Sequence, residues 1–193
     1  MSAMPIIPVL ETERLRLRGW RQSDLAPMAA INGDPEVMTY LGATLDQNSS
    51  DMVIGRFLQK WVEEPQFGWW AVEHIETRAL IGLVGLGRPD YELPCSPCVE
   101  IGWRLARCYW GQGLATEAAR ACLKRGFAVL GLPEIVSFTV ADNARSRRVM
   151  HRLGFRQEDG ADFDHPMVPE GHKLRRHVLY RLSREDWQAQ QAG

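Results

Sequence analysis

The chain has 193 residues, with 23 Lys and Arg against 24 Asp and Glu, a formal net charge of −1, and 45% hydrophobic residues. This length is sufficient for one domain with a sizeable core. The balanced charge argues against a general nucleic-acid or membrane-surface binder, and no apolar run approaches the ~18 residues of a membrane helix.

The amino-terminal segment and the cysteines bear on where the protein works. Residues 1–8 lack the basic stretch of a signal peptide and contain two prolines, so no cleaved leader is expected. Four cysteines in a chain of this size predict free thiols in a reducing compartment rather than a disulfide framework. We therefore expect a cytoplasmic protein.

Strands and helices alternate in the first half of the chain. Apolar and charged residues alternate strictly over residues 14–18, which predicts a strand with one solvated face. Ser23 is a suitable N-cap for the helix that follows, and Gly33 is a suitable end for it. Further elements are expected as a short helix over 35–40, a helix capped by Ser49 or Ser50 and reaching Glu64, and strands over 67–72 and 80–86.

The second half begins with a proline-rich loop over 90–97 and a strand over 99–105. The helix after the two closely spaced glycines Gly111 and Gly113 is expected to reach about Leu130. Its predicted buried positions are Leu114, Ala118, Ala121, Cys122 and Val129. The remaining elements are expected as a strand over 135–140, a helix capped by Asn143, strands starting at 155 and over 176–182 on either side of a polar loop over 159–173, and a last helix capped by Ser183. This order predicts one α/β or α+β layered domain with a mixed sheet.

The segment WGQGLATEA at residues 110–118 carries the main chemical signal. Glycine has no Cβ, so the backbone at Gly111 and Gly113 can turn tightly and approach a ligand closely. The first N–H groups of the following helix lack acceptors within it, and the helix dipole favours an anion there. These properties suit a pyrophosphate, so a phosphorylated cofactor is expected at this turn. A tight turn that binds nothing is the alternative.

Several segments together resemble the GNAT superfamily of acetyl-CoA-dependent N-acetyltransferases. Within it, they are most similar to the branch that contains the RimJ/RimL-type ribosomal-protein N-terminal acetyltransferases. The segments that carry the resemblance are ETERLRLR at 11–18, VEIGW at 99–103, WGQGLATEA at 110–118, NARS at 143–146, LGF at 153–155, and YRL at 180–182 with Glu185 and Trp187. The resemblance implies a single N-acetyltransferase domain over 9–188, with a central mixed, mostly antiparallel sheet flanked by helices. It also implies acetyl-CoA as co-substrate and no metal.

The resemblance assigns a set of cofactor-binding residues. It implies that backbone N–H groups between Trp110 and Ala115 hold the pyrophosphate of coenzyme A, and that Asn143 contacts the pantetheine arm or an ordered water. A backbone N–H near residues 103–105 is expected to polarise the thioester carbonyl. Family members often carry Arg or Gln where this chain has Cys108, so backbone donors are expected to dominate. The expected cofactor-binding residues are Trp103, Leu105, Trp110, Gly111, Gln112, Gly113, Leu114, Ala115, Thr116 and Asn143.

Glu100 is the first candidate catalytic residue. It lies on the predicted strand over 99–105, on the same face as Gly102 and Arg104. A carboxylate near a sheet centre is costly without a partner, so a structural ion pair with Arg104 or another arginine is one explanation. The other is a general base that takes the proton of the attacking ammonium directly or through water. Partial burial raises the pKa of a glutamate and suits that role near neutral pH.

Ser146 is the second candidate catalytic residue. It lies in the first turn of an otherwise apolar helix face and is either a small packing residue or, by the resemblance, a group that stabilises the leaving thiolate. Many superfamily members carry a tyrosine general acid four residues later, where this chain has Met150, which donates no proton. The acid is therefore another group, a water, or absent. Since a thiolate leaves readily, positioning of the amine is expected to supply much of the rate.

The remaining polar groups carry weaker signals. Cys95 and Cys98 form a CxxC pair without the further ligands that zinc needs, so two free thiols in a loop are favoured. The five histidines are expected at the surface, with a substrate contact by His165 or His172 left open. Arg107 either supplies a positive charge to the coenzyme or is a solvated surface residue, and the sequence leaves both open. A contact between one further arginine and the 3′-phosphate of coenzyme A is also left open; the candidates are Arg145, Arg147, Arg148 and Arg152.

These observations predict an enzyme that transfers an acetyl group from acetyl-CoA to a primary amine by direct attack in a ternary complex. Glu100 is expected to accept the proton through water. The acceptor is a protein N-terminus, an amino acid or a polyamine-like small molecule. A non-catalytic module that binds acetyl-CoA or another nucleotide, and transfer of a longer acyl group, are the alternatives. No nucleic-acid or membrane partner is expected, and a homodimer is left open.

Overall fold

The computed structural model describes residues 6–192, so part of the segment on which the leader prediction depends, residues 1–5, lies outside it. Its contacts divide the chain into two compact units. The first unit contains the residues up to Leu86 together with Gly102–Cys122, and the second contains Gly87–Ile101 together with the residues from Leu123 onward. The single domain over 9–188 stays a prediction. None of the described helices has the length and apolar composition needed to span a bilayer.

The strands of the first unit follow one another in chain order, with antiparallel pairing from β1 to β4. Leu17 of β2 lies opposite Val72 of β3. The strand predicted over 14–18 is confirmed as β2, while β1 was not foreseen because two residues carry no periodicity. The strands are β1 (Leu10–Glu11), β2 (Leu15–Arg18), β3 (Gly68–His74), β4 (Leu80–Gly87) and, next to β4, β5 (Glu100–Leu105), of which the residues from Gly102 onward belong to this unit.

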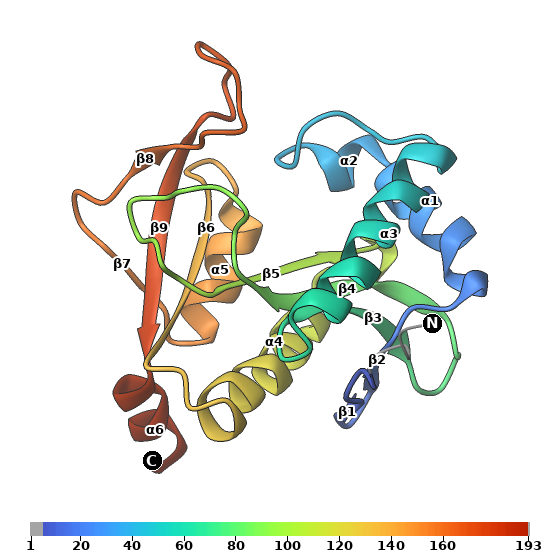
Figure 1. Ribbon diagram of the computed structural model, residues 1–193, viewed down its shortest axis with the longest axis horizontal. Helices are drawn as coiled ribbons and strands as arrows, with labels where there is room; N and C mark the ends of the chain where they lie inside the picture. Colours follow the sequence, from blue (N-terminus) through green and yellow to red (C-terminus); the bar gives the residue numbers. More distant parts are fainter. Residues whose placement is uncertain (1–5, 193) are drawn as a thin grey trace. The chain divides into compact units, whose positions relative to one another are not determined.

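Three helices of the first unit share a core with this sheet (Figure 1). They are α1 (Leu25–Asn32), α2 (Pro35–Met38) and α3 (Gln47–Glu63). The buried side chains of the cluster come from each helix and from β4: Met28, Ile31, Val37, Ile54 and Leu83. The helices therefore cover one face of the strands and leave their polar sides to solvent.

Two predicted helix caps are wrong. Ser23 lies within a 3₁₀ turn, Gln22–Asp24, and Asp24 is the residue that precedes α1. The cap of α3 is Asp46, whose Oδ1 accepts a hydrogen bond of 2.8 Å from Ser49 N, rather than Ser49 or Ser50. Aspartate and serine are nearly equivalent caps, so the sequence alone does not choose between close neighbours.

The second unit is built around β9. β5 and β6 pair in parallel, whereas β6, β7 and β8 each pair with β9 in antiparallel fashion, so the mixed, mostly antiparallel sheet is confirmed. The helix caps predicted at Asn143 and Ser183 are confirmed, because both side chains accept a backbone N–H. The elements are β6 (Glu134–Val140), α5 (Ala144–Arg152), β7 (Arg156–Gln157), β8 (Phe163–Asp164), β9 (Arg176–Ser183) and α6 (Arg184–Ala192).

The helix after the glycines ends differently from its prediction. α4 spans Leu114–Lys124 and continues as one π-helical turn, Arg125–Val129, in which Leu130 N donates to Arg125 O. The wider turn changes which side chains face inward. Val129 was predicted to be buried, but it is 68% exposed, and the buried side chain in this turn is Phe127.

Candidate functional site

The glycine turn lies between a 3₁₀ turn, Arg107–Tyr109, and the start of α4. Gly111 and Gly113 have φ angles of +76° and +79°, a region that side-chain-bearing residues rarely adopt. The first backbone hydrogen bond of the helix runs from Glu117 N to Gly113 O, at 3.0 Å. The preceding N–H groups therefore lack acceptors within the helix, which is the arrangement that binds an anion.

The side chains of the turn shape it rather than supply donors. Trp110 Nε1 donates to Leu105 O at 2.9 Å, and Gln112 Nε2 donates to Cys108 O at 2.9 Å. The hydroxyl of Thr116 is buried without a hydrogen-bond partner in the described part of the chain. The prediction that backbone donors dominate is therefore consistent with the local geometry.

Three residues, Thr12, Arg14 and Glu117, form a clamp on the glycine turn. Glu117 Oε1 accepts hydrogen bonds from Thr12 Oγ1 (2.6 Å) and Arg14 N (2.9 Å), and its Oε2 accepts one from Arg14 Nε (2.7 Å). Arg14 Nη1 then donates to Gln112 O at 3.1 Å. Burial opposes the charge of Glu117, but the hydrogen bonds from Thr12 and Arg14 outweigh it and lower its pKa. The clamp therefore fixes the peptide between the two glycines.

Sequence reasoning missed this clamp. The segments 11–18 and 110–118 both carry the family resemblance, but the resemblance assigned no role to Thr12, Arg14 or Glu117. The only local signal is a glutamate in the first turn of a helix, where an acidic residue usually serves the helix dipole.

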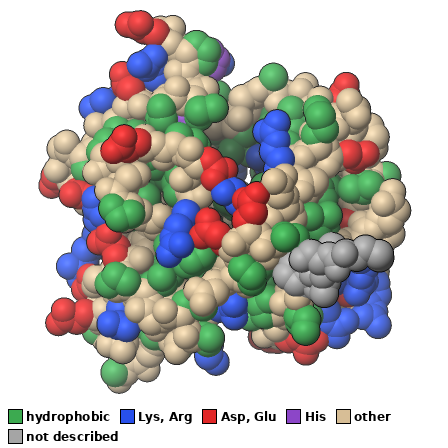
Figure 2. All heavy atoms as spheres, in the orientation of Figure 1, with side chains coloured by type: hydrophobic (Ala, Val, Ile, Leu, Met, Phe, Trp, Pro, Cys, Tyr) green, Lys and Arg blue, Asp and Glu red, His purple; other side chains and the backbone are tan. Residues whose placement is uncertain are grey.

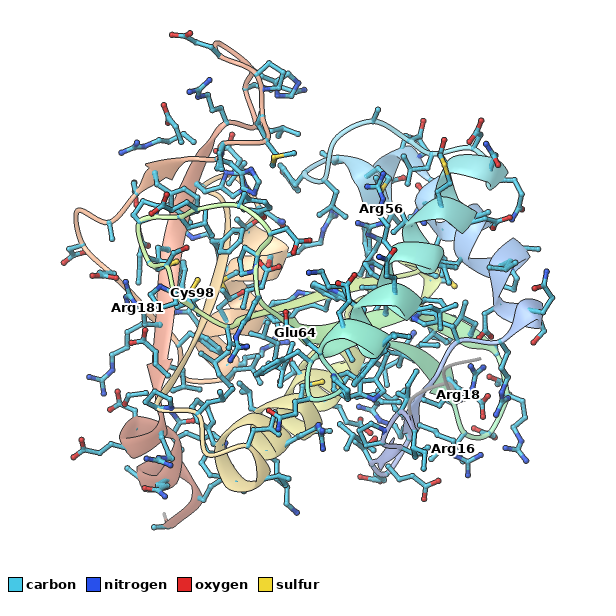
Figure 3. All side chains as sticks on the ribbon, viewed as in Figure 1. Arg16, Arg18, Arg56, Glu64, Cys98 and Arg181 are labelled. Atoms are coloured by element: carbon cyan, nitrogen blue, oxygen red, sulfur yellow. The ribbon has the colours of Figure 1, made fainter. Side chains whose placement is uncertain are left out.

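Replacing Arg14 with methionine is expected to weaken acetyl-CoA binding between about tenfold and a hundredfold. The Gln112 carbonyl loses a charged donor, a hydrogen bond typically worth about 1.5–3 kcal/mol. Isothermal titration calorimetry measures the change. Arg16→Met is the matched control, because Arg16, which is labelled in Figure 3, pairs with Glu11 and Glu73 rather than with the glycine turn. Equal weakening by both substitutions would contradict the clamp.

Glu100 is the first residue of β5 and is half-buried. Removal of its carboxyl from water raises its pKa to about 7. The ion pair with Arg104 or another arginine, one of the two explanations for this residue, is absent from the described contacts of Glu100. The carboxyl therefore changes its protonation state near neutral pH because no cation offsets its desolvation.

The surroundings of Glu100 in the second unit include two other titratable groups. Ser137 Oγ donates to Ile101 O at 3.0 Å and holds the first residues of β5. Burial, and then the charge of Glu100, raise the pKa of Tyr91. Burial first, with the neighbouring thiol and Glu100 as further causes, raises the pKa of Cys98 to about 12. All three groups are therefore protonated below pH 7.

The CxxC pair consists of free thiols. The Sγ atoms of Cys95 and Cys98 are 3.1 Å apart, and Cys95 is buried. Cys98 is labelled in Figure 3. Among residues 6–192, no group of three or more His, Cys, Asp and Glu side chains is arranged to hold a metal ion.

Two loops of the second unit meet at Tyr91 and His165. Tyr91 Oη lies 3.0 Å from His165 Nε2, and the rings of His165 and His177 lie 4.9 Å apart. Burial, and then the proximity of His177, lower the pKa of His165 to about 4. His165 is half-buried rather than fully at the surface, because phenylalanine rings pack beside it, whereas His172 is exposed as expected.

Helix α5 positions the predicted residues Asn143 and Ser146. Asn143 Oδ1 accepts from Ser146 N at 3.2 Å, and Asn143 Nδ2 donates to Thr139 Oγ1 at 3.0 Å. The Ser146 hydroxyl makes no hydrogen bond within the described residues and is half-buried. Met150, which stands where many superfamily members carry a tyrosine, is fully buried and is therefore a core residue in this chain.

Two of the arginines left open as coenzyme ligands have other partners. Arg107 forms an exposed ion pair with Glu36 of α2. Arg147 Nε donates to the buried Tyr180 Oη at 3.0 Å, and its Nη1 donates to Ala141 O at 3.0 Å. Arg148 and Arg152 are exposed.

The predicted site residues thus fall into two groups. The glycine turn belongs to the first unit, together with Trp103 and the buried Leu105. Glu100, Asn143 and Ser146 belong to the second unit.

Comparison with known proteins places the chain in a family. Residues 14–156 match the family described as an acetyltransferase (GNAT) domain. The uncharacterized N-acetyltransferase p20 of Bacillus licheniformis is 31% identical over 152 residues, which are 77% of this chain and 83% of that protein. The crystal structure of an acetyltransferase from Agrobacterium tumefaciens is 30% identical, with a TM-score of 0.72 and coverage of 91% and 94% of the two chains. In fold, the chain is similar to Mycobacterium smegmatis RimJ in complex with CoA-disulfide, with 19% identity, a TM-score of 0.74, and coverage of 93% and 89%.

The chain belongs to the GNAT acetyltransferase family. The predicted GNAT fold is confirmed, and the protein is an acetyltransferase. The family uses acetyl-CoA as the acetyl donor.

Proposed function

We propose that this enzyme acetylates a primary amine by direct attack within a ternary complex. The observation that supports this proposal most strongly is Glu100. Its carboxyl has a pKa of about 7, so its carboxylate is a stronger base than that of an ordinary glutamate and accepts a proton more readily near neutral pH. Glu100 takes the proton of the ammonium group through a water, and the free amine then attacks the thioester carbonyl.

The other site residues bind and orient. The N–H of Trp110 already donates to Arg107 O at 3.0 Å, so the backbone N–H groups of residues 111–116 hold the pyrophosphate. Asn143 contacts the pantetheine arm. A backbone N–H at Trp103 or Leu105 polarises the thioester carbonyl. The hydroxyl of Ser146 has no partner within the described residues, which supports a role in stabilising the thiolate as the C–S bond breaks. As the C–S bond breaks, the nitrogen of the adduct loses its second proton to water and the thiolate takes a proton from water, so that protons and charge balance.

The class of acceptor is inferred from the RimJ/RimL-like segments of the sequence. They are compatible with two classes of acceptor, a protein N-terminal amine and a small primary amine. We also propose a single catalytic domain over residues 9–188, a cytoplasmic location, and no nucleic-acid or membrane partner. A homodimer is compatible with these proposals and is not required by them.

An acceptor screen tests the proposal. The protein is mixed with acetyl-CoA and a panel of peptides with free amino termini, amino acids and polyamines, and the products are identified by mass spectrometry. Direct product detection is preferable to a thiol reagent, because Cys108 is exposed and reacts with such reagents itself. We expect acetylation of at least one amine class. Absence of both turnover and acetyl-CoA binding would overturn the proposed function.

A further inference from the structure

Arg104 of β5 is held by neutral groups in the first unit. Its Nη1 donates to Oδ1 of Asn32, the last residue of α1, at 2.6 Å. Asn32 Nδ2 in turn donates to Ser50 Oγ of α3 at 2.8 Å. Asn32 and Ser50 are both fully buried, whereas Arg104 keeps partial access to solvent. The guanidinium is therefore fixed at one nitrogen, in a residue that keeps partial access to solvent.

Other arginines of low exposure in this chain have carboxylate partners. Arg18 pairs with Asp24 and Glu73, and Arg181 pairs with Glu134 and Glu158. The two arginines are labelled in Figure 3. In both cases these partners outweigh desolvation and raise the pKa of the arginine. Within residues 6–192, Arg104 has no such partner, and desolvation lowers its pKa to about 10.

The edge of the Arg104 guanidinium formed by Nε and Nη2 is suited to bind a ligand. Nε is buried without a hydrogen-bond partner among the described residues, and Nη2 also makes no hydrogen bond there. Arg104 stays protonated at pH 7, so a desolvated positive charge lacks compensation in the free protein. The Nε and Nη2 edge of a guanidinium matches the two oxygens of a carboxylate.

We propose that Arg104 binds a carboxylate of the acceptor, so that the preferred substrate is an amine that also carries a carboxylate. This inference depends on the proposed function. Gly102, which shares the strand face of Arg104, is covered by the ring of Trp69, and Trp69 packs against Phe57. A charged fork beside aromatic side chains is suited to a small organic acid, because the rings contact its carbon atoms.

The anion that pairs with Arg104 has a second possible source, the phosphates of the coenzyme. The hydrogen-bonded neighbours of Arg104, on α1 and α3, lie outside the glycine turn. The N–H groups of that turn supply a separate anion site. These observations favour the acceptor as the source, and the experiment below distinguishes the two.

Matched amine pairs test the inference. L-Alanine and L-alaninamide, and likewise L-glutamate and its diamide, differ only in carboxylates. We expect kcat/KM for the acid to exceed that for the amide by tenfold or more in the native enzyme. Arg104→Gln removes this preference, and Arg104→Lys restores part of it. Turnover of amides and carboxylate-free amines at equal or higher rates would overturn the inference while leaving acetyl transfer to amines intact.

Two further measurements separate this role from a structural one. Acetyl-CoA affinity is expected to be unchanged in Arg104→Gln, and a weakened affinity with an unchanged acid preference would assign the anion to the coenzyme instead. Asn32→Asp supplies an internal carboxylate, to which Ser50 Oγ can donate. We expect it to raise Tm and to reduce the acid preference, whereas Arg104→Gln leaves Tm unchanged or raises it. A lower Tm in both variants would show that Arg104 only joins α1 to β5, and would overturn the inference.

Discussion

Replacing Glu100 with glutamine is expected to lower kcat about 10²–10⁴-fold, the usual contribution of a general base, with little change in acetyl-CoA affinity. In the native enzyme kcat/KM is expected to fall about tenfold per pH unit below about 7, because the protonated carboxyl accepts no further proton. The measurement is a pH–rate profile at saturating acetyl-CoA, with the amine acceptor well below its KM so that the rate reports kcat/KM. Glu76→Gln is the matched control, since Glu76 lies exposed in the turn between β3 and β4.

The same substitution has an opposite effect on stability. The pKa of Glu100 in the folded protein, about 7, exceeds its usual value of 4.5, so the folded state binds this proton more tightly. That stabilisation is complete below pH 4.5 and is lost as pH rises through about 7. We therefore expect Glu100→Gln to increase the free energy of unfolding at pH 8 by about 1–3 kcal/mol over the native chain, after allowance for screening of a half-buried group. Unchanged activity together with unchanged stability would contradict the role of Glu100 as a desolvated base.

Replacing Gly113 with valine is expected to weaken acetyl-CoA binding by at least tenfold and to lower stability by about 1–3 kcal/mol. The φ angle of +79° is strained for a β-branched residue, so relief of that strain reorients the N–H groups at the start of α4. A steric clash is not the cause. A Cβ at this position would lie 3.7 Å from its nearest contact, Arg14 Nη2. Calorimetric titration with acetyl-CoA measures the effect.

Gly171 offers the matched control for this substitution. Its φ angle is +75°, it is exposed, and a Cβ there would meet nothing within 4 Å. Gly171→Val therefore imposes similar backbone strain in a different loop, and we expect it to leave the Kd for acetyl-CoA unchanged. Native-like binding by Gly113→Val would mean that the pyrophosphate lies elsewhere.

Features with a local chemical cause were predictable from the sequence. The alternation over 14–18 and the β-branched run of β6 specify strands through side-chain periodicity and shape. Asn143 caps α5 through a hydrogen bond to a residue only three positions away. The glycine turn follows from backbone conformations that favour glycine at two positions. Each of these depends on neighbours in the chain.

Features that depend on distant residues were not predictable. Arg14 and Glu117 are 103 positions apart, so neither segment alone indicates the clamp. The charge of Arg104 lacks compensation because the side chains that fold around it are Asn32 and Ser50, and no pattern in β5 reveals this. The burial of His165 likewise depends on rings from β6 and β8.

The contact between Tyr91 and His165 has a consequence for motion. Because the imidazole stays neutral down to about pH 4, acidification over the physiological range does not break this contact. The segments over 88–99 and 159–173 are therefore expected to stay in contact at all working pH values. A bulky acceptor that displaces the longer segment would pull on the shorter one and thereby shift the carboxyl of Glu100 at its end.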